Sequence, residues 1–276
     1  MRLNGQFQVE FIVFSIFIIT LFLGAAVGFM AGLLGIGGGL LIVPVLVMLL
    51  PAFDVVSQSD AILVAVATSL ASIIVTATSS VRAHHKMDNV PWAIATPVVV
   101  GAACGAWFVG YLAHLVGGQL LQMFFGIAVL LLAARMLGSR SVLGSRLLPG
   151  RCATGAISVV LGGLASLLGI GGGALFVPVL NYYSVDMRRA IGCAAASGIA
   201  IAIFGTLGYV IAGWRHYQFE HGFIGYIYIP ALLGIVSTSV FTAPLGARMT
   251  QRLPLLTVKR VFGVFLLLVS LKMILS

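Results

Sequence analysis

Two glycine-rich stretches contain the residues of this chain that are best placed to do chemistry. The first reads GIGGGLLIVP over residues 35–44, and the second reads GIGGGALFVP over residues 169–178. Glycine disfavours a helix by about 1 kcal/mol per residue relative to alanine, so three consecutive glycines predict a break. The closing proline lacks a backbone N–H and biases the preceding residue towards an extended conformation. We therefore expect a helix to end near Leu34 and a second to start near Pro44, with Pro178 acting in the same way.

An unwound segment inside an apolar run presents bare amides and carbonyls, which lipid tolerates only where the backbone is buried in protein or lines a cavity. Each segment also leads into a helix N-terminus, whose free N–H groups and positive dipole end bind anions without Lys or Arg. The predicted substrate-binding residues are the glycines, as amide donors, and two serines: Gly35, Gly37, Gly38, Gly39, Ser69, Gly169, Gly171, Gly172, Gly173 and Ser197. The alternative interpretation is that these glycines serve only close helix packing.

The two stretches belong to a longer internal repeat. Residues 28–46 and 162–180 are identical at 14 of 19 positions. A stripe of small residues at spacing four also occurs in both halves, as Gly24, Gly28 and Gly32 and as Ser158, Gly162 and Ser166. Such stripes let helices approach closely in lipid. A broken helix at matching positions of two halves is typical of a transporter with a central substrate site.

The composition is that of an integral membrane protein. Of the 276 residues, 61% are hydrophobic and 8% are charged, whereas a soluble domain carries about 25% charged residues. Apolar segments recur at about 11–34, 40–50, 61–81, 90–113, 120–137, 153–168, 174–183, 190–212, 223–247 and 256–275. The net charge of +9 comes with Lys and Arg that lie almost wholly between these segments, which indicates membrane topology and not nucleic acid binding. We expect a multi-pass protein of the cell (inner) membrane.

Loop charges indicate whether the two halves are parallel or inverted. We place the basic connecting loop, residues 139–152, in the cytoplasm, which also puts Arg82 and Lys86 inside. If residues 153–183 cross the membrane once, four further arginines lie outside, whereas a hairpin broken at the glycines puts all four inside: Arg188, Arg189, Arg248 and Arg252. The hairpin is therefore favoured. An odd number of membrane crossings then separates the halves, so the two halves are expected to have inverted orientations in the membrane.

The predicted fold is an all-α polytopic membrane protein of two inverted repeats, each a glycine-broken helical hairpin plus about three transmembrane helices. The first repeat is expected to cover residues 1–138 and the second residues 153–276, with 139–152 as the connecting loop. The sequence does not define an oligomeric state.

Acidic residues are confined to segment ends and loops, as Glu10, Asp54, Asp60, Asp88, Asp186 and Glu220. Cation transporters and proton pumps usually need a carboxylate inside the membrane, so this distribution argues against a metal or drug-cation pump. We predict no metal, no cofactor and no catalytic residues, because no Ser/His/Asp or Cys/His set stands at one inferred depth.

A basic cluster lies at the cytoplasmic end of the segment 61–81 and includes Arg82 and His84. Most such clusters only orient a membrane protein. The alternative is that Arg82 and His84 line a vestibule that attracts anions.

The paired G-x-G-G-G-x-x-x-V-P stretches resemble the TauE/SafE family, the sulfite exporters. Further points of resemblance are the Thr68-Ser69 pair, His84 before Asn89-Val-Pro-Trp92, and residues 230–248 with their Pro-Leu-Gly-Ala-Arg end. The resemblance covers nearly the whole chain, and it departs at Ala196-Ser197, where Thr-Ser is more typical. It implies transport of small sulfur-containing anions such as sulfite, sulfoacetate or other organosulfonates.

The sequence thus predicts a transporter, and not an enzyme, that exports a small anion by alternating access. Its expected partners are that anion and the lipid bilayer. Two other classes stay open, namely a passive anion channel and a membrane scaffold without transport.

We expect Gly38→Ala and Gly172→Ala to lose anion binding while the protein stays folded, because alanine favours helix.

Overall fold

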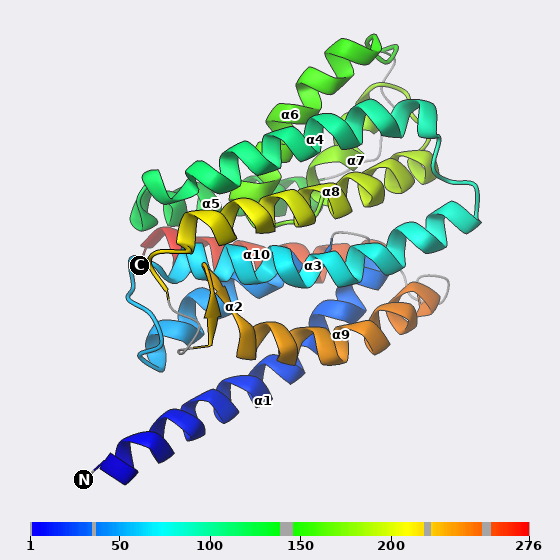
Figure 1. The fold of residues 1–276 in the computed structure, drawn as a ribbon. Coiled ribbons are helices and arrows are strands. Elements are labelled where there is room, and N and C mark those ends of the chain that lie inside the picture. Colours follow the sequence, from blue (N-terminus) through cyan, green and yellow to red (C-terminus); the bar gives the residue numbers. More distant parts are fainter. Residues whose placement is uncertain (1, 35–36, 139–145, 218–221, 250–254, 276) are drawn as a thin grey trace.

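The computed structural model describes residues 2–34, 37–138, 146–217, 222–249 and 255–275 (Figure 1). Its elements are α1 (Arg2–Leu34), α2 (Gly39–Ala52), α3 (Ala61–Lys86), α4 (Trp92–Leu112), η1 (Ala113–Leu115), α5 (Gly118–Gly138), α6 (Arg151–Leu167), α7 (Gly173–Tyr182), α8 (Met187–Gly213), β1 (Phe223–Ile224), β2 (Ile227–Tyr228), α9 (Ile229–Met249) and α10 (Leu255–Leu275). The fold is therefore helical apart from one two-stranded hairpin.

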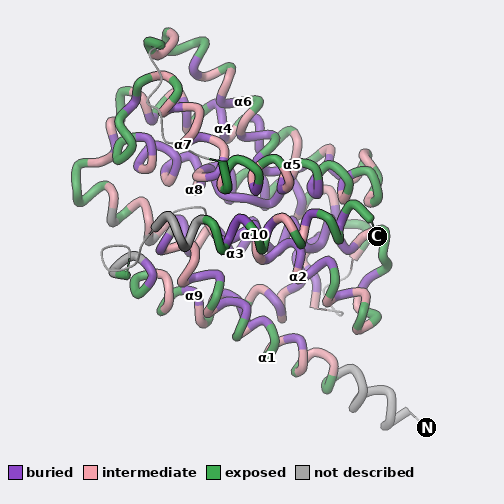
Figure 2. Tube along the Cα trace, turned by 180° about the vertical axis from the view of Figure 1, so that it is seen from behind, coloured by how far each residue is buried: buried purple, intermediate pink, exposed green. Residues whose placement is uncertain are grey.

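Six helical segments of the described residues are long and apolar enough to cross a membrane. They are Glu10–Leu33, Ala61–Lys86, Trp92–Leu115, Gly118–Gly138, Met187–Gly213 and Ile229–Gly246. The expectation of a multi-pass membrane protein is confirmed. Helices α3 and α8 are buried along most of their length, whereas α1 and α5 expose much of their surface (Figure 2).

Helices α2 and α7 are too short to span a bilayer. Their 14 and 10 residues extend about 21 and 15 Å at 1.5 Å per residue, against a hydrocarbon core of about 30 Å. Each follows a longer helix across a glycine segment, α1 in the first half and α6 in the second. Each half therefore contains the predicted break followed by a short second helix, and the hairpin course through the membrane stays a prediction.

The prediction that the second arms start near the prolines is wrong. Helix α2 begins at Gly39 and α7 at Gly173, so Pro44 and Pro178 lie inside the helices, five residues after the first. A proline removes only the hydrogen bond to the residue four before it, and the remaining turns continue the helix. The breaks are made by the glycines and not by the prolines.

Each half of the chain packs its first helix against the other half. Helix α1 of the first half packs mainly on α9 of the second, and α6 of the second packs mainly on α4 of the first. In each pair one hydroxyl bonds a carbonyl of the facing helix: Thr238 Oγ1 donates to Leu21 O at 2.7 Å, and Ser166 Oγ to Ala106 O at 3.1 Å. Between the pairs, α3 and α8 lie side by side and run in opposite directions (Figure 1).

Basic residues are concentrated at one end of the bundle, where Asp88 and Asp186 also lie, and Arg215 lies at the other end. The end of α3, with Arg82 and Lys86, lies beside the start of α8, with Arg188 and Arg189 (Figure 1). The loop that carries Asp54 precedes α3 at the opposite end. This distribution agrees with a cytoplasmic face at the basic end.

The small-residue stripes lie at the exchanged helix pairs, as predicted. A Cβ added to Gly28 of α1 would lie 2.6 Å from Ser239 Cα of α9, and one added to Gly162 of α6 would lie 2.5 Å from Ala102 Cα of α4. These contacts are between backbones, so no side chain fits between the helices.

Two predicted boundaries need correction. The segment expected at 223–247 begins with the antiparallel β1–β2 hairpin, and α9 starts only at Ile229. Gly225 adopts φ 56°, which favours glycine in a tight two-residue turn. The connecting loop ends earlier than predicted, because α6 already begins at Arg151.

We expect Gly162→Ala to destabilise the protein by about 1–3 kcal/mol, because its methyl group overlaps the α4 backbone. Gly155→Ala on the same helix is the matched control. Its Cβ would meet only Pro97 O at 3.8 Å, so the alanine should be neutral or stabilising. Melting temperatures of the purified variants in detergent test this prediction, and equal changes in the two variants would contradict it.

Candidate functional site

The two glycine segments, from opposite halves, lie directly against each other. A Cβ added to Gly37 would lie 3.1 Å from Gly171 Cα and 3.3 Å from Gly171 N. A Cβ added to Gly39 would overlap the carbonyl oxygen of Gly169 and lie 3.0 Å from Ile170 Cα. We call this contact the glycine junction, residues 37–39 with 169–173. Gly35 lies outside the described residues.

Both short helices begin at the glycine junction with the same hydrogen-bond pattern. The Gly38 carbonyl accepts the amides of Leu41 and Ile42 at 3.0 and 3.3 Å. The Gly172 carbonyl accepts those of Leu175 and Phe176 at 3.3 and 2.8 Å. In each helix the two amides that precede these donors have no hydrogen-bond partner among the described residues. They are the amides of Gly39 and Leu40 in α2 and of Gly173 and Ala174 in α7. The junction therefore brings together two sets of free donors at positive dipole ends.

The two predicted serines flank the glycine junction, but their hydroxyl protons are already engaged. Ser69 of α3 donates to Gly169 O at 2.8 Å, a bond between the halves. Ser197 of α8 donates to Ala194 O at 2.9 Å within its own helix. Its oxygen also lies against Gly172, where an added Cβ would overlap it. Both side chains are fully buried.

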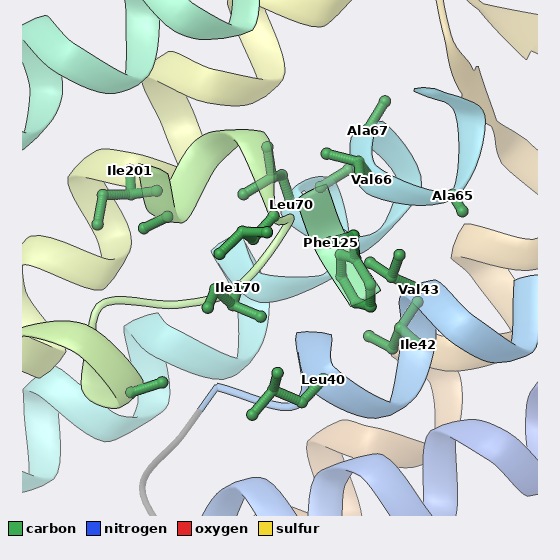
Figure 3. Packing of buried hydrophobic residues seen from close by; sticks show 14 of the residues in the cluster. Leu40, Ile42, Val43, Ala65, Val66, Ala67, Leu70, Phe125, Ile170 and Ile201 are labelled. Atoms are coloured by element: carbon green, nitrogen blue, oxygen red, sulfur yellow. The ribbon is translucent and has the colours of Figure 1, made fainter. Parts of the chain in front are cut away.

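The surroundings of the glycine junction are apolar. Leu40 and Val43 of α2 share one buried cluster with Ile170, Leu70 and Phe125 (Figure 3). Of the acidic residues that the structure describes, none is buried. In this low-dielectric setting the dipoles of the two helix starts are weakly screened.

The β1–β2 hairpin was missed by the sequence analysis and is fixed to α3 beside the junction. The amide of Tyr228 donates to Thr68 Oγ1 at 3.0 Å, and both residues are buried. Thr68 belongs to the Thr68-Ser69 pair that carries part of the family resemblance. The alternation in Phe223-Ile-Gly-Tyr-Ile-Tyr228 around a glycine is the signal that predicts such a hairpin.

The acidic end of the bundle is closed by an aromatic group. Tyr217 OH donates to Asp60 Oδ2 at 2.9 Å, and the Tyr217 ring stacks on Phe223 with centroids 4.5 Å apart. Burial and the hydrogen bond to Asp60 raise the pKa of Tyr217 above its usual range, so the phenol stays a donor at neutral pH.

Arg82 and His84 lie far from the glycine junction. They occupy the last turns of α3, and His84 follows Ser69 by 15 residues, or about 22 Å of helix. Arg82 is exposed and His84 is half-buried. Neither residue contributes to the junction, so any role in anion capture lies at the basic end.

Gly38→Ala and Gly172→Ala are expected to destabilise the protein, contrary to the expectation from the sequence. Gly38 has φ 76°, a conformation that strains alanine, and its Cβ would lie 2.5 Å from Val27 Cγ1. A Cβ at Gly172 would lie 2.6 Å from Ala194 O. Both substitutions would disturb packing and binding at once.

We expect Ser69→Ala to destabilise the protein by about 1–2 kcal/mol, because it leaves the buried Gly169 carbonyl without its donor. Ser72→Ala is the matched control on the same helix. Ser72 is equally buried but donates to Thr68 O of its own helix at 2.8 Å, and its removal should cost less. Chemical denaturation in detergent compares the two variants, and an equal loss of stability would contradict a bridging role of Ser69.

Comparison with known proteins identifies the family of the chain. The family described as sulfite exporter TauE/SafE matches residues 20–273. A "Probable membrane transporter protein" of Haemophilus influenzae is 38% identical over 271 residues, which cover 95% of this chain and 100% of the relative. Proteins with the same description from Methanocaldococcus jannaschii and Bacillus subtilis are 27% and 26% identical, over 95% and 94% of this chain and 99% and 97% of the relatives. The solved structures contain no match. The chain therefore belongs to the TauE/SafE sulfite exporter family of membrane transporters.

Proposed function

We propose that this transporter carries a small sulfur-containing oxyanion, such as sulfite or an organosulfonate, and holds it with the backbone amides of the glycine junction. The observation that carries the proposal is the contact of Gly37 with Gly171, which brings two helix starts with free amides together. A compact anion can receive hydrogen bonds from both halves at such a place.

The absence of a buried carboxylate among the described acidic residues supports an anionic substrate. A cation in the apolar core would need a counter-charge there, whereas an anion can be stabilised by amide dipoles alone. The family description and the names of the relatives support transport in general.

Two observations support inverted repeats, with the cytoplasm at the basic end. Helices α3 and α8 occupy corresponding places in the two halves and run in opposite directions (Figure 1). If α1 corresponds to α6 and α4 to α9, the packed pair α1–α9 of the bundle corresponds to the packed pair α6–α4. The glycine junction then lies at the pseudo-two-fold axis, and rocking of one half against the other opens it to each side in turn.

The glycine junction is closed in this structure. Gly38, Gly39 and residues 169–172 are buried, and the hydroxyl of Ser69 is bonded across the junction. Substrate entry therefore requires the two segments to separate, which breaks the Ser69–Gly169 bond and frees a hydroxyl donor for the anion.

The first experiment is a thermal-shift screen of the purified protein against sulfite, thiosulfate, sulfate, sulfonates and carboxylates. We expect stabilisation by the sulfur oxyanions and none by matched chloride. Counterflow in proteoliposomes then separates the mechanisms: saturable counterflow indicates a carrier, and flux without saturation indicates a channel. If no anion is bound, the scaffold hypothesis stands and the proposal is wrong.

Gly198→Ala offers a sharper test of the glycine junction than a change at Gly38 or Gly172. Gly198 lies inside α8, and its only neighbour within 4 Å of an added Cβ is Gly172 N, at 3.3 Å. The methyl group would cover that amide while alanine favours the helix by about 1 kcal/mol. We expect the melting temperature to change little and the Kd for sulfite to rise about tenfold or more.

Gly155→Ala serves again as the control, because its methyl group would meet only Pro97 O at 3.8 Å among the described residues and lies near the start of α6, 14 residues before Gly169. It should bind sulfite as the parent does. Normal binding by Gly198→Ala, in a protein of unchanged stability, would show that the Gly172 amide does not hold the anion.

Topology is tested by cysteine labelling in a protein whose Cys104, Cys152 and Cys193 have been replaced. Leu147→Cys and Met249→Cys lie in exposed positions at the basic end, the first in the connecting loop and the second at the end of α9 in the second half. We expect both to react only from the cytoplasmic side, whereas Leu115→Cys at the opposite end should react only from outside. Opposite labelling of the first two positions would favour parallel halves.

A further inference from the structure

The second half of α8, beyond the part that flanks the glycine junction, carries two buried hydroxyls without a partner among the described residues. Thr206 Oγ1 and Tyr209 OH are inaccessible and make no hydrogen bond among the described residues. Thr206 is 8% exposed and Tyr209 is fully buried. Buried polar atoms in folded proteins are nearly always paired, so an orphaned pair in one place needs an explanation.

The two hydroxyls share one row along α8. Ala202, Thr206, Tyr209 and Gly213 follow at spacings of four, three and four, which places them on one helix face. Ala202 packs on α3 through Ile73. At the other end of the row, a Cβ on Gly213 would lie 2.5 Å from Tyr226 N of the hairpin turn. Thr206 and Tyr209 therefore lie between α3 and the β1–β2 hairpin.

The same stretch of α8 adjoins the glycine junction. A Cβ on Gly205 would lie 2.6 Å from Ser166 Oγ, three residues before Gly169, and 3.0 Å from Leu70 Cδ1, next to Ser69. Long helical side chains lean over the preceding turn, which for Tyr209 is the turn of Gly205 and Thr206. The hydroxyls thus lie between the junction and the aromatic closure at the acidic end.

We propose that Thr206 and Tyr209 form a second binding station for the oxygen atoms of the transported anion, on the path between the glycine junction and the acidic end of the bundle. Their hydroxyl protons have no acceptor among the described residues, and a passing oxyanion supplies one. A hard cation is a poorer occupant, because it needs about six oxygen ligands, including carboxylates, and this row offers two hydroxyls.

This inference rests on the proposed anion transport and predicts an unusual combination of effects. Tyr209→Phe and Thr206→Val remove hydroxyls that have no protein partner, so the protein without ligand should melt at the same temperature or higher. Both variants should nevertheless bind sulfite more weakly, with a Kd raised about fivefold each and more than tenfold in the double variant. Sulfite counterflow in proteoliposomes should slow in parallel.

Thr20→Val is the control for a bonded hydroxyl. Thr20 is fully buried on α1, where it donates to Ile16 O at 2.8 Å and lies outside the proposed path. We expect this variant to bind sulfite normally. Tyr182→Phe, on the exposed side of α7, controls for loss of a phenol in general.

The outcomes are distinct. Normal sulfite binding and counterflow in the double variant would mean that the hydroxyls hold only water, and the station would be wrong. A lower melting temperature for Tyr209→Phe would reveal a protein partner and would also overturn it. If Gly198→Ala loses sulfite while the double variant keeps it, the glycine junction stands without the station. If the parent protein binds no anion, both proposals fail together.

Discussion

The contact between two backbones at the glycine junction is the constraint on which the rest of the structure depends. At Gly39 a single methyl group would overlap the Gly169 carbonyl, so neither segment can carry a side chain towards the other. The unwound backbone is tolerated inside an apolar core because protein covers it on every side. Ser69 completes the contact by bonding the carbonyl that faces it from the other half.

Such a contact requires the surrounding helices to hold the halves together without much help from apolar burial, since lipid is as apolar as the core. The exchanged pairs α1–α9 and α4–α6 meet this requirement with small residues and one interhelical hydroxyl bond each. Bonds of this kind contribute about 0.6 kcal/mol on average in membranes, so close packing is the larger contribution. The same glycines that interrupt a helix in one place therefore bring helices together in another.

Sequence alone predicted much of this arrangement because duplication makes a weak signal visible twice. One GIGGG in an apolar run is ambiguous between packing and binding, whereas two with matching flanks predict paired broken helices. The helix starts at Gly39 and Gly173 differ from the prediction, which placed both starts near the prolines and not at the last glycine of each segment. The hairpin at 223–228 was missed because its apolar residues continue into a membrane span. The lack of a hydrogen-bond partner for Thr206 and Tyr209 depends on tertiary packing that no local pattern encodes.

The hydrogen bond between Thr68 and Tyr228 has a consequence for the energetics of the whole transport cycle. If the two inverted halves were identical, the outward-open and inward-open states would be related by an exchange of the halves and would have equal free energy. Here Thr68 fastens the hairpin beside α3, whereas the corresponding position on α8 is Ala196, which has no hydroxyl to offer. Under the proposed inverted arrangement, the hairpin side is therefore held by a hydrogen bond that the matching position of the other half cannot form, and the two end states of the cycle need not have equal free energy. Sequence divergence after duplication would in this way give the proposed transport cycle a preferred resting state.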